Sequence, residues 1–306
     1  MLSSEGMNED EKVKTLLYFY AKNVQKKAAE NQPSFEKDPD VQEFCDLRYV
    51  GKDGNSLAMD AYRPLNRSGD KLPVVLVVHG GGLMVGDNKI VSVFCRHLAK
   101  RGFLVFSLDY RLLTEADARS EINDVCEGFR FAETMIGQFG GDLERVNVFA
   151  ESAGAFLALY AIASQKSDVL QDKLGCVRSE LKIQKTAFSS GMFYTRKLDL
   201  IGVAYPMQIY GKDFVNPFFM KYMNPENPEV TGNLPPTLLI SSDADFLRKY
   251  TLNYDKALEM AGVEHNLVYY TDNKELTHSF AVYRLDLPEA KEVMDRICEH
   301  FSGGIK

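Results

Sequence analysis

The sequence predicts an α/β protein in which an eight-stranded, mostly parallel sheet is flanked by helices. The first observation is that strand-like and helix-like patterns alternate along the chain. The second is that several strand-like runs, such as residues 73–78, are continuously apolar, which is typical of strands buried on both faces of a sheet. We expect strands near residues 45–50, 56–62, 73–78, 103–109, 145–150, 184–189, 236–241 and 265–271.

Five stretches between these strands carry apolar residues at the 3.6-residue spacing of helices that pack on a sheet. They are residues 88–101, 118–138, 153–165, 247–261 and 288–301. The chain has 306 residues, of which 45% are hydrophobic, so it can bury a large core. This length favours one α/β domain with an insertion over two independent domains.

Two segments fall outside the strand and helix alternation. Residues 8–31 predict an amphipathic helix within an N-terminal segment, residues 1–43, that we expect to form part of a cap. The candidate apolar positions of this helix are Val13, Leu16, Leu17, Phe19, Tyr20 and Val24. Residues 191–232 are rich in aromatic residues, methionine and proline, which predicts a cap insertion of short helices with an apolar lining. Residues 44–190 and 233–306 then form the core.

The aromatic and methionine side chains of the insertion have a second interpretation. Such side chains can form an adaptable pocket wall, and they can equally serve as the packing of a small helical subdomain. The sequence leaves both interpretations open for each of these residues.

Composition disfavours two classes of partner. Lys and Arg number 36 against 43 Asp and Glu, a formal net charge of −7, which disfavours nucleic acid and anionic membranes. No signal-peptide pattern and no apolar run long enough to span a bilayer is present, so we expect a cytoplasmic protein without membrane insertion. The sequence leaves open whether the chain forms a homo-oligomer.

The five cysteines predict reduced, mostly buried thiols. Their number is odd and they lack C-x-x-C spacing, which disfavours a disulfide framework and a zinc site. They are Cys45, Cys95, Cys126, Cys176 and Cys298.

Ser152 lies between a predicted strand, residues 145–150, and a predicted helix, residues 153–165. The surrounding pattern is G-x-S-x-G, in which Ala150 replaces the first glycine and Gly154 is the second. A sharp turn between strand and helix exposes a serine hydroxyl, and small neighbours allow the strand and helix to approach closely. The pattern predicts a nucleophile, although serine and small residues also begin ordinary helices.

The third predicted strand is followed by His79, Gly80, Gly81 and Gly82. Consecutive glycines leave backbone N–H groups free to stabilise a negatively charged oxygen, together with the N–H group of Ala153. A phosphate-binding loop is the alternative, but no Gly-Lys-Ser/Thr sequence follows.

Two later strands are followed by ionisable residues. Asp245 comes after residues 236–241, and His278 comes after residues 265–271. Asp243 lies in the same loop and is the alternative to Asp245. The Asp-x-Asp spacing could also indicate a metal, but a hard cation usually requires more carboxylates, so we expect no metal and no organic cofactor.

These motifs resemble those of the hormone-sensitive-lipase-like branch of the α/β-hydrolase fold family. The resemblance, which extends from about residue 45 to the C-terminus, rests on His-Gly-Gly-Gly at 79–82, Glu-Ser-Ala-Gly at 151–154, Asp-Phe-Leu-Arg at 245–248 and Thr-His-Ser-Phe at 277–280. The order Ser, Asp, His along the chain agrees with it. Two residues depart from the pattern: Ala150 replaces the usual glycine, and Phe246 stands where the family often has proline.

The resemblance implies a role for each motif residue. Ser152 is the expected nucleophile, His278 the base, and Asp245 the carboxylate that orients the base. The expected oxyanion hole consists of the N–H groups of Gly81, Gly82 and Ala153, with His79, Gly80 and Glu151 as supporting residues.

The expected function is a serine carboxylic-ester hydrolase. Its expected partner is a small-molecule ester with a small to medium acyl or aryl group, including acetylated sugars and other short-chain esters. An amidase, peptidase or thioesterase could use the same triad. A non-catalytic binding protein on the same fold is the other alternative, although such proteins typically lose a triad residue and His278 is present.

Overall fold

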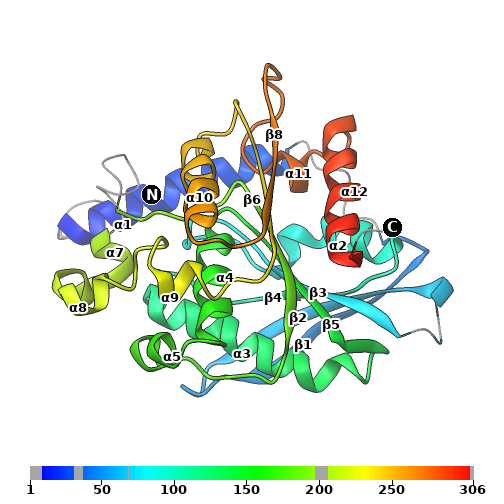
Figure 1. Ribbon diagram of the computed structural model, residues 1–306, viewed down its shortest axis with the longest axis horizontal. Helices are drawn as coiled ribbons and strands as arrows, with labels where there is room; N and C mark the ends of the chain where they lie inside the picture. The colour runs from blue at the N-terminus through cyan, green and yellow to red at the C-terminus, as the bar shows by residue number, and fades with distance from the viewer. Residues whose placement is uncertain (1–8, 31–36, 68, 70, 197–205, 304–306) are drawn as a thin grey trace.

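The computed structural model describes residues 9–30, 37–67, 69, 71–196 and 206–303. Within them, eight strands form one sheet in the order β1-β2-β4-β3-β5-β6-β7-β8 (Figure 1). The strands are β1 (Val41–Val50), β2 (Ser56–Pro64), β3 (Leu72–Val78), β4 (Leu104–Leu108), β5 (Gly141–Glu151), β6 (Ile183–Ser189), β7 (Thr237–Ser242) and β8 (His265–Tyr270).

The sheet is mostly parallel. Strands β1 and β2 pair antiparallel, as do β2 and β4. The pairs β4–β3, β3–β5, β5–β6, β6–β7 and β7–β8 are all parallel. The predicted fold class is therefore confirmed. Because the parallel strands point the same way, the loops that follow β3, β5, β7 and β8 meet at one edge of the sheet, where ligands bind in open α/β sheets.

Helices cover both faces of the sheet (Figure 1). On one face lie α2 (Ser92–Lys100) and α12 (Pro288–Ser302), and on the other lie α3 (Ala118–Ile136), α4 (Ala153–Ser164) and α10 (Arg248–Met260). The side chains of β3 alternate between the two apolar clusters: Val74 and Leu76 join the α3 and α4 side, and Val75 and Val77 join the α2 side. This arrangement buries β3 on both faces and explains its continuous apolar run.

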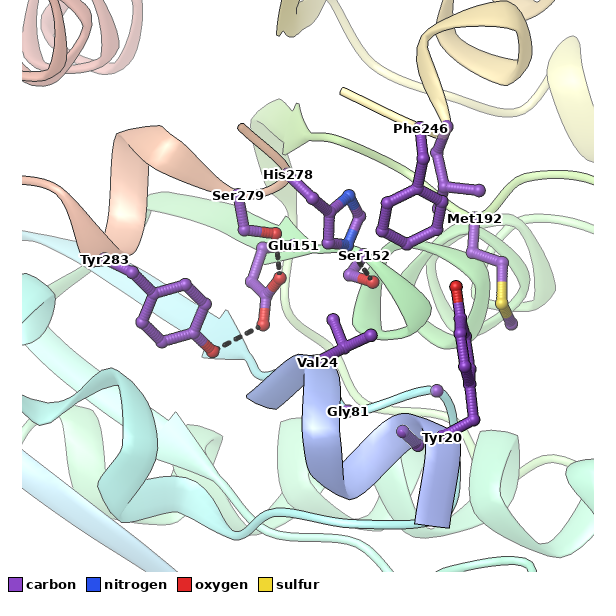
Figure 2. Close-up of a pocket in the computed structure, with 13 residues that line it drawn as sticks. Tyr20, Val24, Gly81, Glu151, Ser152, Met192, Phe246, His278, Ser279 and Tyr283 are labelled. Carbon is purple, nitrogen blue, oxygen red and sulfur yellow. Dashed lines mark hydrogen bonds between the residues drawn. The ribbon is translucent and has the colours of Figure 1, made fainter. Parts of the chain in front are cut away.

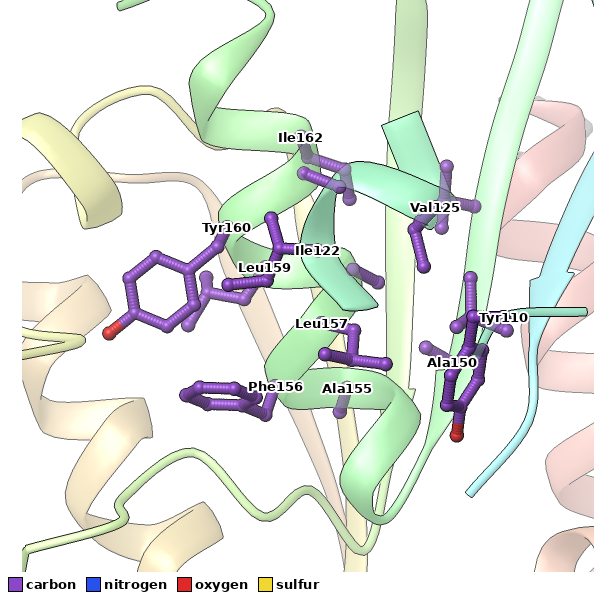
Figure 3. Close-up of a cluster of buried hydrophobic side chains, with 14 of the residues drawn as sticks. Tyr110, Ile122, Val125, Ala150, Ala155, Phe156, Leu157, Leu159, Tyr160 and Ile162 are labelled. Atoms are coloured by element: carbon purple, nitrogen blue, oxygen red, sulfur yellow. The ribbon is translucent and has the colours of Figure 1, made fainter. Parts of the chain in front are cut away.

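Helix α4 is buried throughout. Every one of its residues is buried, and none is charged, as expected for a helix enclosed on all sides. Figure 3 shows Leu157, Leu159 and Ile162 of α4 beside Ile122 and Val125 of α3. Tight packing of this kind fixes α4 and with it the turn at Ser152 that precedes the helix.

Shorter elements complete the described fold. They are α5 (Asp168–Leu174), α7 (Pro206–Tyr210), α8 (Pro217–Met220), α9 (Pro228–Thr231), α11 (Phe280–Tyr283) and the 3₁₀ turns η1 (Leu65–Arg67), η2 (Asn88–Val91) and η3 (Gly211–Val215). The predicted insertion does contain short helices, although residues 197–205 lie outside the described residues. Pro217 and Pro228 occupy the first turns of α8 and α9, where the missing N–H group costs nothing.

Most described aromatic side chains of the insertion are packed in the apolar core. Phe193, Tyr194, Tyr210 and Phe219 are all buried there, and Met192 alone of the described insertion residues borders the cavity at Ser152. This distribution favours the packing interpretation for those aromatic residues. The division of the chain into core and cap stays a prediction.

Helix α1 (Glu9–Ala29) matches the predicted N-terminal helix and crosses the edge of the sheet where the parallel strands end (Figure 1). Leu17 and Ala21 are buried against the core, whereas Leu16 and Phe19, both predicted as apolar-face positions, are 69% and 57% exposed. The described part of the chain contains no helix with the length and apolar character needed to cross a bilayer.

Candidate active site

The loops after β5, β7 and β8 bring Ser152, Asp245 and His278 together. The Nε2 atom of His278 lies 2.8 Å from Oγ of Ser152, and its Nδ1 atom lies 2.8 Å from Oδ1 of Asp245. Asp245 is fully buried, and the other two side chains are largely shielded. The hydroxyl, imidazole and carboxylate therefore form a continuous chain of hydrogen bonds. Figure 2 shows the hydrogen bond between His278 and Ser152.

The backbone at Ser152 is strained. Its φ is 51° and its ψ is −121°, a region that residues with a Cβ atom rarely adopt. A Cβ atom on Gly154 would overlap the carbonyl oxygens of Val78 and His79, so a glycine is required there. Ala150, in contrast, lies inside β5 with its methyl group in the core, so the departure from G-x-S-x-G leaves the turn intact.

The glycine run after β3 has an equally specific conformation. Gly81 and Gly82 have φ angles of 117° and 63°, and a Cβ atom on Gly81 would overlap the carbonyl oxygen of Val85. The N–H groups of both glycines donate to no other described residue. Ala153 is the first residue of α4, so its N–H group has no acceptor within the helix. Gly81 and Gly82 line the same cavity as Ser152.

His79 holds this glycine loop. Its ring is fully buried and stacks on Tyr110 with ring centroids 4.3 Å apart, and its Nδ1 atom lies 2.7 Å from the carbonyl oxygen of Gly80. The hydroxyl of Tyr110 donates to the carbonyl oxygen of His79 at 2.9 Å. The imidazole that contacts Ser152 is that of His278, whereas His79 contacts the glycine loop and Tyr110.

Glu151 connects three parts of the site beneath Ser152. Its buried carboxylate accepts a hydrogen bond from the N–H group of Gly80 at 2.7 Å. It also accepts hydrogen bonds from the hydroxyl of Ser279 at 2.6 Å and the hydroxyl of Tyr283 at 3.0 Å (Figure 2). These contacts join the glycine loop to the histidine loop. Sequence reasoning expected Glu151 as a supporting residue and missed Ser279 and Tyr283.

The two aspartates of the β7 loop have different partners. Asp245 accepts hydrogen bonds from His278, from the hydroxyl of Ser241 at 2.9 Å and from the N–H group of Leu247 at 2.9 Å. Asp243 is exposed and accepts a hydrogen bond from Tyr269. Of the two, Asp245 is the one positioned to orient His278.

Asp245 and His278 each shift the pKa of the other. Burial by itself lowers the pKa of His278, but the charge and hydrogen bond of Asp245, with the charge of Glu151, raise it above its ordinary value. Burial likewise raises the pKa of Asp245, and the charge and hydrogen bond of His278 bring it below the usual range for a carboxyl group. The site is therefore suited to a charged imidazolium beside an ionised carboxylate.

A cavity of about 60 Å³ opens onto Ser152 and His278. Its lining is mainly apolar and consists of Tyr20, Ala21, Val24, Gly81, Gly82, Glu151, Ser152, Met192, Phe246, Leu247, His278, Ser279 and Tyr283. Figure 2 shows Tyr20 and Val24 of α1 facing the site from the side opposite His278. The ring of Phe246, the residue that replaces the family's frequent proline, packs on His278 with centroids 4.3 Å apart.

Among the residues that the structure describes, no three His, Cys, Asp or Glu side chains are grouped so that they could hold a metal ion. The five cysteines are free thiols; Cys45 is exposed, Cys298 is partly buried, and the other three are buried.

The chain belongs to the α/β-hydrolase fold family, whose model matches residues 75–282. It is 30% identical to the esterase LipI of Mycobacterium tuberculosis over 234 residues, which cover 73% of this chain and 70% of that protein. It is 27% identical to the isoprenylcysteine α-carbonyl methylesterase ICME of Arabidopsis thaliana over 232 residues, or 70% of this chain. The chain spans about half of the length of that plant protein.

Solved structures confirm the fold. Esterase B of Lactobacillus rhamnosis superimposes with a TM-score of 0.86 at 22% identity, covering 97% of this chain and 96% of that one. Brefeldin A esterase, described as a bacterial homologue of human hormone-sensitive lipase, gives a TM-score of 0.71 at 19% identity, covering 99% and 88%. The resemblance read from the sequence motifs is thus confirmed.

Proposed function

We propose that this protein is a serine carboxylic-ester hydrolase that cleaves small to medium acyl or aryl esters through an acyl-enzyme intermediate. The observation that carries the proposal is the chain of hydrogen bonds from Ser152 through His278 to Asp245, with both nitrogen–oxygen distances at 2.8 Å. Membership of a family whose matched relatives are named esterases supports the same conclusion.

In the first half of the reaction, His278 accepts the hydroxyl proton of Ser152 as Oγ attacks the ester carbonyl carbon. Asp245 holds the other ring nitrogen and stabilises the imidazolium, in agreement with the raised pKa of His278. The carbonyl oxygen becomes negative and accepts hydrogen bonds from the N–H groups of Gly81, Gly82 and Ala153.

The second half releases both products. His278 returns its proton to the leaving alcohol, and the acyl group remains on Ser152. A water molecule then loses a proton to His278 and attacks the acyl carbon, and the acid departs as Ser152 regains its proton. These steps need only the residues named here and water.

The size and lining of the cavity support the choice of substrate class. A volume of about 60 Å³ with apolar walls suits a short acyl chain, as in acetyl esters and acetylated sugars. The cytoplasmic location and the possibility of a homo-oligomer stay predictions from the sequence.

The test is a serine replacement combined with covalent labelling. Ser152→Ala should lower the turnover of 4-nitrophenyl acetate by about 10⁴ to 10⁶-fold, because the members of such a triad act as one unit. A fluorophosphonate should label the parent protein once, on Ser152. Ser56→Ala, which changes an exposed serine of β2, is the matched control and should retain activity and labelling.

Three results would count against the proposal. Full turnover by a clean preparation of Ser152→Ala would remove the nucleophile assignment. A folded parent protein with neither turnover nor an adduct would favour the non-catalytic binding protein. Faster cleavage of an anilide or thioester than of the matching ester would favour an amidase, peptidase or thioesterase.

A further inference from the structure

One side of α1 faces the site with three residues. Tyr20, Val24 and Lys27 are spaced by four and three positions, so they lie on the same side of the helix. Tyr20 and Val24 line the cavity at Ser152, and all three line a second cavity beside it. This side of the helix presents Tyr20 and Val24 to the cavity at Ser152 and the cationic Lys27 to the second cavity.

The second cavity is larger, at about 380 Å³, and adjoins the first. The two share Tyr20, Val24, Phe246, His278 and Tyr283 as lining residues. The second cavity borders His278 but not Ser152, Gly81 or Gly82. It therefore lies on the imidazole side of the site, whereas the small cavity contains the serine and the glycine loop.

The chemistry of the proposed reaction indicates which portion of the ester each cavity holds. His278 must return its proton to the leaving oxygen, so the leaving group has to lie beside Nε2 of His278. The cavity that borders the imidazole is in the right place for the alcohol portion of the ester. The small apolar cavity, which contains Ser152 and the glycines, is left for the acyl portion.

The charges around the larger cavity are cationic. Its lining includes Lys27 and Arg284 and contains no aspartate or glutamate. Arg284 is engaged by Asp286 through two hydrogen bonds of 2.9 and 2.8 Å. Lys27 is exposed, and no acidic side chain in the described part of the chain lies within 4 Å of its ammonium group. Lys27 thus supplies an unbalanced positive charge in a protein whose formal net charge is −7.

We propose that this second cavity is a leaving-group subsite for esters of aryl alcohols that carry a negatively charged group, with Lys27 as the residue that recognises the charge. The rings of Tyr20 and Phe246 border the cavity and provide apolar contact for an aryl group. The inference rests on the proposed ester hydrolysis and specifies its substrate class. The reaction remains hydrolysis of one ester bond by water, with His278 supplying the proton to the phenolate.

A matched pair of substrates tests the subsite. 4-Acetoxybenzoate carries a carboxylate on its leaving group, and 4-acetoxybenzamide carries a neutral amide of similar shape. The measured quantity is the ratio of kcat/KM for the carboxylate ester to kcat/KM for the amide ester. Comparing this ratio between variants cancels the intrinsic difference in reactivity between the two esters.

Lys27→Gln should lower the ratio by about threefold, the size expected for one exposed ion pair, with little change for the amide ester. Lys27→Glu should lower it further, and high salt should bring the parent ratio towards that of Lys27→Gln. Lys26→Gln is the matched control because Lys26 lies next along the helix, faces Glu30 and does not line the cavity. The inhibition constant of 4-hydroxybenzoate, the anionic product, should rise in Lys27→Gln.

The outcomes separate the two proposals. An unchanged ratio in Lys27→Gln, with both esters still cleaved, overturns the subsite and leaves ester hydrolysis standing. A parent protein that cleaves the amide ester but not the carboxylate ester overturns it as well. Failure of the parent to cleave either ester or to react with a fluorophosphonate overturns the proposed function instead.

Discussion

The two sides of the site are built differently. The core side consists of α4 and the loops after β3, β5, β7 and β8, and its residues Ser152, Asp245 and Glu151 are buried and joined by short hydrogen bonds to neighbouring loops. The α1 side consists of one helix. Among its described side chains only Leu17 and Ala21 are buried, and Leu16 and Phe19 face solvent.

This difference suits the two tasks of the proposed reaction. Proton transfer and nucleophilic attack require positions fixed to about half an ångström, which only a rigid, well-packed support provides. Recognition of a substrate tolerates small movements, and a helix with few buried contacts can open locally at a low free-energy cost. We therefore expect changes on the core side to affect catalysis and stability, and changes on the α1 side to affect which substrate is preferred.

The largest expected effect concerns the carboxylate on the core side. Asp245→Asn should lower kcat by about 10⁴-fold, because an amide neither selects the correct imidazole tautomer nor stabilises the imidazolium. Asp243→Asn is the matched control, and it should change kcat by no more than about twofold because Asp243 contacts Tyr269 at the surface. Greater damage from Asp243→Asn in parallel kinetics would reverse the assignment.

The next effect concerns the packing that supports Ser152. Gly154→Ala should lower the free energy of unfolding by about 3 kcal/mol, because the added methyl group overlaps backbone oxygens of Val78 and His79 that cannot move freely. Urea denaturation measures this change. Gly137→Ala is the control, since an added Cβ atom there meets nothing within 4 Å, and it should leave stability unchanged or slightly higher. Equal stability of the two variants would contradict a rigid core side.

The smallest effect concerns the α1 side. Val24→Ala removes two methyl groups from the wall of the small cavity, so it should raise the kcat/KM for 4-nitrophenyl butyrate relative to acetate by about threefold. Stability should change little, because Val24 is only partly buried. Leu16→Ala, an exposed position of the same helix, should change neither quantity. A loss of stability in Val24→Ala as large as that in Gly154→Ala would remove the distinction between the two sides.

Much of the fold could be predicted because burial in a parallel sheet leaves a strong local pattern. The run at residues 73–78 lies within β3, and its alternate side chains enter the two apolar clusters. Helix α11, in contrast, has four residues, too few to show helical periodicity, so the sequence does not predict it. Helix α1 was predicted, but Leu16 and Phe19 face solvent because its contacts with the core are few.

The candidate site divides in the same way. The proximity of Ser152, Asp245 and His278 could be predicted because their chemical types occur in loops directly after predicted strands. Tyr283 and Phe246 could not be assigned to the site, since one reaches Glu151 from α11 and the other packs on His278 through its loop conformation. Lys27 could not be assigned either, because the apolar positions of α1 do not indicate which loops of the core the helix contacts.

The position of α1 also determines when the site can be completed during synthesis. Helix α1 precedes every other described element, yet the cavity that it borders includes His278, which follows β8, and Tyr283 of α11. The cavity therefore cannot form before the chain has been synthesised as far as Tyr283. Until that point Tyr20 and Val24 lack the side chains of His278 and Tyr283 that complete the cavity in the folded protein.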